Sequence, residues 1–313
     1  MQIGIDPRRA IALSGMSSAA PLISLLDGSR EREQLIAAAA AQGIPRQMTE
    51  RVLTLLAAGG ALDDFPAATL RALPPEVRSR LAPELATASL AHRDGDGGAR
   101  ALARRRNALV RVEGEPRVAR VIARILSRSG VGQVEFVRLA DPPGRAEHDR
   151  ATAQPANRGP ALQRGRVART PDLVVMAGRQ LGDGHATDLT RQRVAHLAVL
   201  AGEAIGVVGP LVLPGRTACL RCLDYARAAN DPSWPLILAQ IARRRPEPAA
   251  CDTVLATAVA AQAAAQALLA LDRSPDESAA VNGTLELVLP DWRWRRRTWP
   301  QHPACPCSSH TLL

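Results

Sequence analysis

Apolar and polar residues follow one another along residues 1–65 in a pattern that predicts a strand pair and three short helices. Residues 2–4 and 10–13 flank an Asp-Pro-Arg-Arg segment, which is typical of a turn between two strands. Three groups of apolar residues then recur at helical spacing: Leu22, Leu25 and Leu26; Leu35, Ile36 and Ala39; and Met48, Val52, Leu55 and Leu56. We therefore predict a small winged-helix-like α+β domain over residues 1–65.

The next segment has a different composition. Residues 66–106 contain four prolines and a polar, glycine-rich run at 93–98. Prolines interrupt helices, and polar glycine-rich runs are typical of connections. We interpret residues 66–106 as a partly helical linker.

From residue 107 onward, strand-like and helix-like patterns alternate. Apolar runs at 108–112, 134–137 and 172–176 predict buried strands, and a helix with one apolar face is predicted between the first two. Residues 196–212 offer two or three more strands, with Gly202, Gly206 and Gly209 expected at turns. This alternation predicts an α/β fold over residues 107–313, with a Rossmann-like open sheet.

The basic residues change the picture because all 40 are arginine. Chemistry that requires lysine, such as a Schiff base or the phosphate-binding lysine of a P-loop, is therefore excluded. Residues 1–100 are neutral, so the formal net charge of +10 lies in residues 101–313. Aromatic residues make up 2% of the chain, which argues against a stacking groove for single-stranded nucleic acid. We expect no nucleic-acid partner.

No segment favours a membrane location. The chain opens on Met-Gln-Ile-Gly-Ile-Asp, which lacks the basic and apolar regions of a signal peptide. The alanine-rich stretch at 253–271 contains Gln262 and Gln266 and fits a packed internal helix better than a bilayer span. We expect a cytoplasmic protein with no membrane partner.

Four of the five cysteines form two close pairs, Cys219-x-x-Cys222 and Cys305-x-Cys307. Four thiolates suit a tetrahedral zinc ion, and four protein ligands leave no position for a catalytic water. We therefore predict a structural zinc site formed by Cys219, Cys222, Cys305 and Cys307. The alternative is four unligated thiols.

These pairs and their surroundings resemble a known family. The run at 209–223, the alanine-rich stretch after it and the terminal Cys-Pro-Cys resemble the ThiF and ubiquitin-activating-enzyme superfamily. The resemblance is closest to a branch of ThiF-like, leader-peptide-binding proteins that serve YcaO cyclodehydratases in making azole-modified peptides (TOMMs). In that branch a PqqD-like element for precursor recognition precedes the ThiF-like domain, and residues 2–13 and 25–30 are similar to it. The resemblance implies a homodimer, a leader-peptide ligand and a YcaO-type partner enzyme.

The nucleotide loop departs from that family. Its members place G-x-G-G-x-G after the first strand, so that backbone N–H groups and a helix N-terminus face the phosphates. This chain instead has Gly114, Glu115, Pro116 and Arg117. Proline removes a donor, arginine adds bulk, and glutamate adds a negative charge. Arg138 and Gly178 stand where the family carries acids for the ribose and for magnesium, and the family's catalytic lysine is absent. We expect ATP not to bind in the family's manner.

Cys251 precedes the alanine-rich stretch, where ThiF-like and MoeB-like enzymes carry a cysteine. A helix N-terminus is able to lower the pKa of a thiol. A thiol without an adenylated substrate has nothing to attack, however, so we favour a free cysteine over a catalytic one.

Three functional hypotheses follow. The first is a catalytically degenerate adaptor that binds a precursor peptide by β-augmentation. The resemblance implies that its contacts would involve Ala10, Ile11, Ala12, Leu13, Arg46 and Arg51. The second is an ATP-dependent adenylyltransferase that activates a ubiquitin-like carrier or a peptide C-terminus, with Cys251 as acceptor. The third, a DNA-binding winged helix, is disfavoured because residues 46–56 carry only two arginines against one glutamate.

An arginine cluster near the C-terminus alternates with tryptophan. Trp292 and Trp294 interleave with Arg293 and Arg295, and two further arginines follow. On a strand, this alternation places indoles and guanidinium groups on opposite faces. We expect the indoles to pack inward beneath a solvated basic face, in preference to a patch for an acidic peptide or a nucleic acid.

Overall fold

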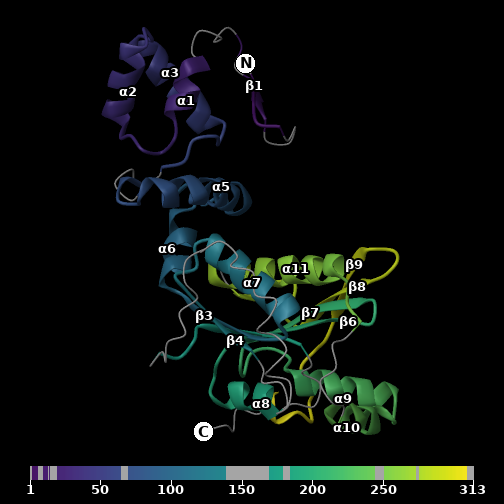
Figure 1. Cartoon of the computed structure of the whole chain (residues 1–313). Helices are drawn as coiled ribbons and strands as arrows, with labels where there is room; N and C mark the ends of the chain where they lie inside the picture. The colour runs from purple at the N-terminus through teal and green to yellow at the C-terminus, as the bar shows by residue number, and fades with distance from the viewer. Residues whose placement is uncertain are drawn as a thin grey trace. The chain divides into compact units, whose positions relative to one another are not determined.

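The computed structural model describes residues 2–5, 10–12, 14, 20–64, 70–138, 169–178, 184–243, 250–272 and 275–308, with only the backbone described at 242, 243 and 308. The chain divides into two compact units, Met1–Ala103 and Arg104–Leu313 (Figure 1). Each unit has its own apolar cores.

The first unit begins with the predicted strand pair and helices. β1 (Gln2–Ile3) and β2 (Ile11–Ala12) are antiparallel, with Gln2 opposite Ala12. Three helices follow: α1 (Ala20–Leu25), α2 (Arg32–Ala41) and α3 (Arg46–Ala58). Their buried leucines, including Leu22, Leu35 and Leu56, pack together, and Ile3 and Ile11 pack against them from the strands. The apolar spacing read from the sequence therefore corresponds to one small core.

A second core of the first unit lies within the segment that we interpreted as a linker. α5 (Pro75–His92) and α6 (Ala99–Asn107) are its helices, and α6 spans the boundary between the two units. The buried residues are Leu70, Leu73, Leu81, Leu85 and Leu102. Pro83 lies inside α5 at an exposed position. The segment is thus largely helical and has its own packed interior.

The second unit contains a seven-stranded sheet with the order β4-β3-β5-β6-β7-β8-β9. Its strands are β3 (Leu109–Gly114), β4 (Gln133–Arg138), β5 (Leu173–Ala177), β6 (His196–Gly202), β7 (Ile205–Val212), β8 (Gly283–Val288) and β9 (Arg293–Thr298). The first four strands in this order are parallel, and the last three pairings are antiparallel. The predicted α/β fold with an open sheet is confirmed.

Helices cover both faces of this sheet, as Figure 1 shows. α7 (Pro116–Arg128) and α11 (Thr253–Asp272) lie on one face, where their apolar residues pack against β3, β5 and β6. α8 (Gly184–Arg191), α9 (Leu220–Asn230) and α10 (Trp234–Arg243) lie on the other. Parallel strands covered on both faces require apolar side chains at successive positions, and β5 is buried at every residue.

Among the described residues, α11 is the one helix long and apolar enough to cross a membrane. It packs instead against α7, β6 and β7. The small side chains of Ala260, Ala263 and Ala264 are fully buried and permit close approach to the sheet. The internal helix predicted at 253–271 is therefore confirmed.

Two local expectations are wrong. Gly206 and Gly209 lie inside β7, and the turn after β6 is made by Glu203 and Ala204, both with positive φ. Gly206 is required within the strand because a Cβ there would lie 2.3 Å from a methyl carbon of Val259. Trp292 and Trp294 do not pack inward; their side chains are 42% and 36% exposed.

A buried ion pair holds α6 against the end of α11. The Arg105 guanidinium donates two hydrogen bonds to the carboxylate of Asp272, from Nε at 2.7 Å and from Nη2 at 2.5 Å. A third goes to the carbonyl of Ser129. Both side chains are more than 90% buried, and the paired geometry satisfies the planar guanidinium.

This pair yields a stability prediction. Asp272→Asn leaves a buried guanidinium without its counter-charge and is expected to cost about 3–5 kcal/mol of unfolding free energy. The matched control is Asp188→Asn, which breaks the exposed pair with Arg191 and is expected to cost at most about 1 kcal/mol. Urea unfolding followed by tryptophan fluorescence measures both, because all four tryptophans lie in the second unit. Equal costs for the two variants would contradict the prediction.

Candidate functional site

The four predicted metal ligands meet in one buried cluster. Cys219 is the N-cap of α9 and Cys222 lies in its first turn, where the Cys222 amide donates to the Cys219 carbonyl. Cys305 and Cys307 come from the short helix η3 (Pro306–Ser308) and the residue before it. A two-residue gap at a helix start therefore turns both sulfur atoms of the first pair toward the second pair.

The sulfur geometry fits a tetrahedral metal site. All four Sγ atoms lie within 4.8 Å of one another. The separations are 3.8 Å for Cys219–Cys222, 3.6 Å for Cys219–Cys305 and 3.3 Å for Cys222–Cys307. A tetrahedron with metal–sulfur bonds of about 2.3 Å has edges of about 3.8 Å. The donor set is therefore already near the spacing that one ion requires.

Burial and mutual hydrogen bonding make the thiols unequal. The thiol of Cys219 donates to Cys222, which lowers the pKa of Cys222 to about 4 and raises that of Cys219. Burial raises the pKa of Cys307 to about 12. Neutral thiols clustered in an apolar surrounding are chemically inert, whereas a cation binds their thiolate forms. The cluster has the composition of a structural metal centre.

Aromatic and basic side chains surround this centre. Trp299 is buried beside the cysteines, and its indole nitrogen donates to Thr284. Arg227 of α9 stacks on Trp299 and on Trp234, at 5.4 and 4.9 Å from the ring centroids. Burial lowers the pKa of Arg227. These contacts connect α9, α10 and the segment after β9 into one packed layer.

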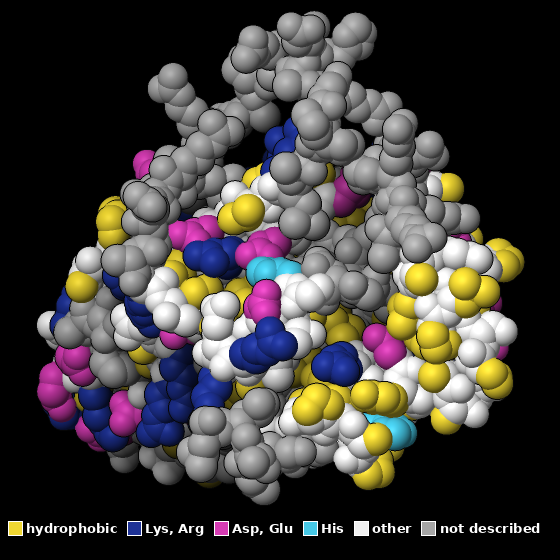
Figure 2. All heavy atoms as spheres, turned by 90° about the horizontal axis from the view of Figure 1, so that it is seen from below, with side chains coloured by type: hydrophobic (Ala, Val, Ile, Leu, Met, Phe, Trp, Pro, Cys, Tyr) yellow, Lys and Arg dark blue, Asp and Glu magenta, His cyan; other side chains and the backbone are white. Residues whose placement is uncertain are grey.

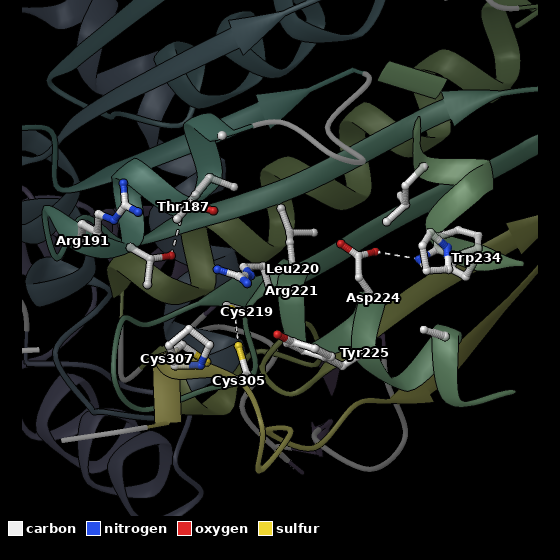
Figure 3. Close-up of a pocket in the computed structure, with 17 residues that line it drawn as sticks. Thr187, Arg191, Cys219, Leu220, Arg221, Asp224, Tyr225, Trp234, Cys305 and Cys307 are labelled. Atoms are coloured by element: carbon white, nitrogen blue, oxygen red, sulfur yellow. Dashed lines mark hydrogen bonds between the residues drawn. The ribbon is translucent and has the colours of Figure 1, made fainter. Parts of the chain in front are cut away.

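A cavity of about 560 Å³ opens beside the cysteine cluster. Its walls come from α8, α9, α10 and η3, and Figure 3 shows the side chains that line it. The indole of Trp234 donates to Asp224 at 3.1 Å, and burial raises the pKa of that carboxyl. Figure 2 views the molecule from the side of these helices and shows apolar side chains next to groups of charged ones. The volume and the mixed lining suit a small ligand or a few peptide side chains.

The loop in the nucleotide position has an unsuitable helix start. Glu115 is the N-cap of α7 and Pro116 is its first residue. The Glu115 amide donates to the carbonyl of Ala177 in β5, at 2.9 Å. An exposed carboxylate and a residue without an N–H therefore occupy the place where a phosphate would need donors. Arg138 is exposed and is the last residue of β4.

Cys251 lies beside this loop. Its carbonyl accepts a hydrogen bond of 2.6 Å from the Arg117 guanidinium, and α11 begins two residues later. At the start of α11, the Ala256 amide makes a hydrogen bond that lowers the pKa of this thiol, but this effect is outweighed. Burial raises its pKa, and the opposing charge of Arg117 is the smaller effect. Cys251 is thus close to the loop without being an activated thiolate.

The residues assigned to peptide binding lie in the first unit. Ile11 and Ala12 form β2, Ala10 precedes it, and Leu13 lies outside the described residues. Ile11 points inward, because its side chain packs with Ile3 against the helical core. Arg46 donates to both oxygens of Glu33 and to Glu50, so its charge is already paired within the domain. Arg51 is exposed on α3.

Two polar features were missed from the sequence. Nε2 of His185 lies 2.6 Å from the carboxylate of Glu113, which is the residue before Gly114. His196 is fully buried; its Nδ1 contacts the Val194 carbonyl, its Nε2 has no hydrogen-bond partner among the described residues, and burial lowers its pKa to about 4. The sequence around each histidine has no periodic pattern that would indicate a contact partner. These contacts are therefore seen only in the folded structure.

Comparison with known proteins identifies the fold. No protein-family model matches the chain, and no curated protein matches it. E. coli MccB with AMPCPP and selenomethionine MccA superposes with a TM-score of 0.59 and 13% identity, over 98% of this chain and 95% of that one. A heterocyclase in complex with substrate and cofactor gives 0.60 and 15%, over 97% of this chain and 37% of that one. E. coli MccB with ATP gives 0.55 and 14% identity, with coverage of 98% and 95%. The ThiF-like fold expected from the resemblance is confirmed.

The cysteine cluster predicts one tightly bound metal ion per chain. Purified protein should contain it, and Cys305→Ser should lose it together with thermal stability, because metal binding and local folding are coupled. Cys251→Ser is the matched control, since that cysteine lies outside the cluster. Elemental analysis by mass spectrometry measures the content and identifies the ion. Equal metal content in the two variants would contradict the assignment.

Proposed function

We propose that the chain is a peptide-binding adaptor in the modification of ribosomally made peptides, with a ThiF-like domain that does not activate a nucleotide. The observation that carries this proposal is the start of α7. A glutamate N-cap followed by proline places a negative charge and a missing donor at the position where a fold of this kind presents amides to phosphates.

Zinc is the ion that best suits the cysteine cluster. A closed set of four buried sulfur ligands with tetrahedral spacing favours Zn²⁺ over the oxygen-preferring cations. Cys219, Cys222, Cys305 and Cys307 would hold it. When bound, the ion supplies a cross-link between the start of α9 and the C-terminal segment, and the full shell leaves no vertex for substrate.

The N-terminal unit is proposed to supply peptide recognition. β2 pairs with β1 on one side, and no other strand pairs with it in the described part of the chain. An extended leader peptide would add to that side, with backbone hydrogen bonds giving affinity and side-chain contacts giving selectivity. Ala12 is exposed on the strand, and Arg51 on α3 makes no ion pair with another described residue, whereas Arg46 is held by two glutamates.

The structural neighbours support a role near peptide modification. MccB has been crystallised with MccA and with ATP, and the heterocyclase with a substrate and a cofactor. The likeness extends over nearly the whole of this chain, including the small N-terminal unit. We further propose that a YcaO-type enzyme acts on the captured peptide and that the adaptor is a homodimer.

An adenylyltransferase is the second candidate. Cys251 lies next to the loop through its hydrogen bond with Arg117, which is the arrangement that an acceptor thiol near an activated carboxylate would need. The raised pKa of Cys251 argues against this role, because a nucleophilic thiol works as the thiolate.

Calorimetric titration with magnesium ATP separates the two candidates. We expect no heat beyond that of dilution, at concentrations that would detect a Kd of about 1 mM. Magnesium chloride alone is the control titration. One-site ATP binding that supports a Cys251-dependent thioester with a carrier or peptide, lost in Cys251→Ala, would favour the adenylyltransferase instead.

Peptide capture is tested with fluorescein-labelled peptides encoded by small reading frames that neighbour the gene. We expect one of them to bind the full chain, and Arg51→Glu to weaken it about tenfold, which corresponds to about 1.4 kcal/mol. Arg80→Glu makes the same charge change on an exposed helical position of the same unit and should leave affinity unchanged. Fluorescence anisotropy measures each Kd, and equal affinities for both variants would exclude α3 from the site.

A further inference from the structure

β9 forms one end of the seven-stranded sheet (Figure 1). Each of its six residues is exposed. It pairs with β8 on one side, and no strand of the described residues pairs with it on the other. The outward N–H and C=O groups of such an edge are free to pair with another extended chain. An exposed edge strand of this kind either binds a partner strand or carries features, such as charged side chains, that prevent unwanted pairing.

Charged side chains repeat along one face of this edge. Arg293, Arg295 and Arg297 alternate with Trp294 and Arg296 along the strand. Successive members of the set Arg293, Arg295 and Arg297 therefore lie about 7 Å apart on the same face. Arg293 makes no ion pair within the described part of the chain, and Arg295 makes only an exposed pair with Asp291. Positive charge is thus repeated at the spacing of alternate residues in a neighbouring strand.

Within this row, the Arg297 guanidinium also stacks on the ring of Trp299, at 4.5 Å from its centroid. The remaining side chains of the edge are held by other contacts or are exposed indoles. The Arg296 guanidinium donates to the carbonyls of Ala279 and Val281, which removes it from contact with a ligand. Trp292 and Trp294 are 42% and 36% exposed, which is unusual in a chain with 2% aromatic residues. Tryptophan and arginine together are the residues most enriched where proteins bind partners tightly.

A second copy of the chain is a poor occupant. Two β9 strands paired antiparallel about a two-fold axis normal to the sheet place odd-numbered residues opposite odd-numbered residues. In the register centred on Arg295, arginine would then face arginine at positions 293, 295 and 297, and like charges opposite each other destabilise a strand pair. Charge repulsion therefore disfavours pairing between two copies of β9, whereas an acidic strand would be attracted.

A nucleic acid is also less suitable. Phosphate binding uses arginine charge but leaves the free backbone groups of the edge without partners, and stacking needs a series of accessible rings. An acidic peptide satisfies both the backbone and the guanidinium groups.

We propose that the outer edge of β9 binds an extended acidic segment of a partner polypeptide, which adds as a further strand with carboxylates at every second position. Those carboxylates would lie opposite Arg293, Arg295 and Arg297, and the indoles of Trp292 and Trp294 would border the added strand. This site lies in the second unit and goes beyond leader recognition, which we assign to residues 1–65. It would allow the adaptor to hold a partner protein and a substrate peptide at the same time.

The test uses the full chain and a synthetic peptide of alternating threonine and glutamate, capped at both ends. Calorimetry should detect binding to the wild-type protein, and Arg293→Gln with Arg295→Gln should weaken it at least about tenfold. The matched control, Arg124→Gln with Arg128→Gln, removes the same charge from exposed positions on α7 and should retain wild-type affinity. Circular dichroism confirms folding of both variants, whose altered side chains are all exposed.

Hydrogen exchange distinguishes strand addition from adsorption to a basic surface. With the peptide bound, amides of residues 293–298 should exchange more slowly, whereas those of α7 should not change. Absence of binding, equal losses in the two double variants, or binding without slower exchange at 293–298 would each overturn the proposal. Tighter binding of oligothymidylate than of the peptide, lost in the β9 variant, would also overturn it and assign the edge to nucleic acid. None of these outcomes bears on Arg51 or on the leader peptide, so this proposal and the proposed function fail separately.

Discussion

The spacing of four sulfur atoms is the constraint on which the lower half of the second unit depends. The two cysteine pairs are 85 and 86 residues apart along the chain, yet they meet within hydrogen-bonding distance of one another. Their meeting fixes the path of the chain from β9 through Trp299 to η3 and brings that path against the start of α9. Arg227 can stack between two indoles, and Cys305, Pro306 and Cys307 can line the neighbouring cavity, only because this segment is held there.

Features encoded locally could be predicted, and features made by distant partners could not. The cysteine pairs predict a shared metal site because their spacing places two ligands on one turn. The periodic spacing of apolar residues predicts the strands and helices that form the sheet. The contact of Glu113 with His185 joins residues 72 apart that carry no common pattern. Trp294 shows the limit of periodicity: alternation correctly separates the two faces of β9, but burial depends on whether anything covers the end of the sheet.

Arginine performs several different tasks in this lysine-free chain. Arg105 is buried in a paired geometry with Asp272, Arg296 donates to main-chain carbonyls, and Arg46 joins two acids on the N-terminal helices. A planar guanidinium suits each of these uses better than an ammonium, because its donors point in fixed directions. Net charge alone therefore says little about partners. The informative arginines are the ones that the fold leaves exposed and repeats at regular spacing, and β9 carries them.

The glycine that remains in the nucleotide loop is explained by packing alone. Gly114 has a φ of +132°, and a Cβ on it would lie 1.6 Å from the carbonyl oxygen of Ala177. No other residue fits there, whether or not a phosphate is ever bound, because β3 and β5 approach each other at this point. The positions that follow have no such steric demand: Glu115 and Arg117 are exposed and Pro116 is half-buried. They are the positions where phosphate binding would select glycine, and they carry other residues. Gly114 is thus required by the packing of the sheet, and its presence is no evidence for a bound phosphate.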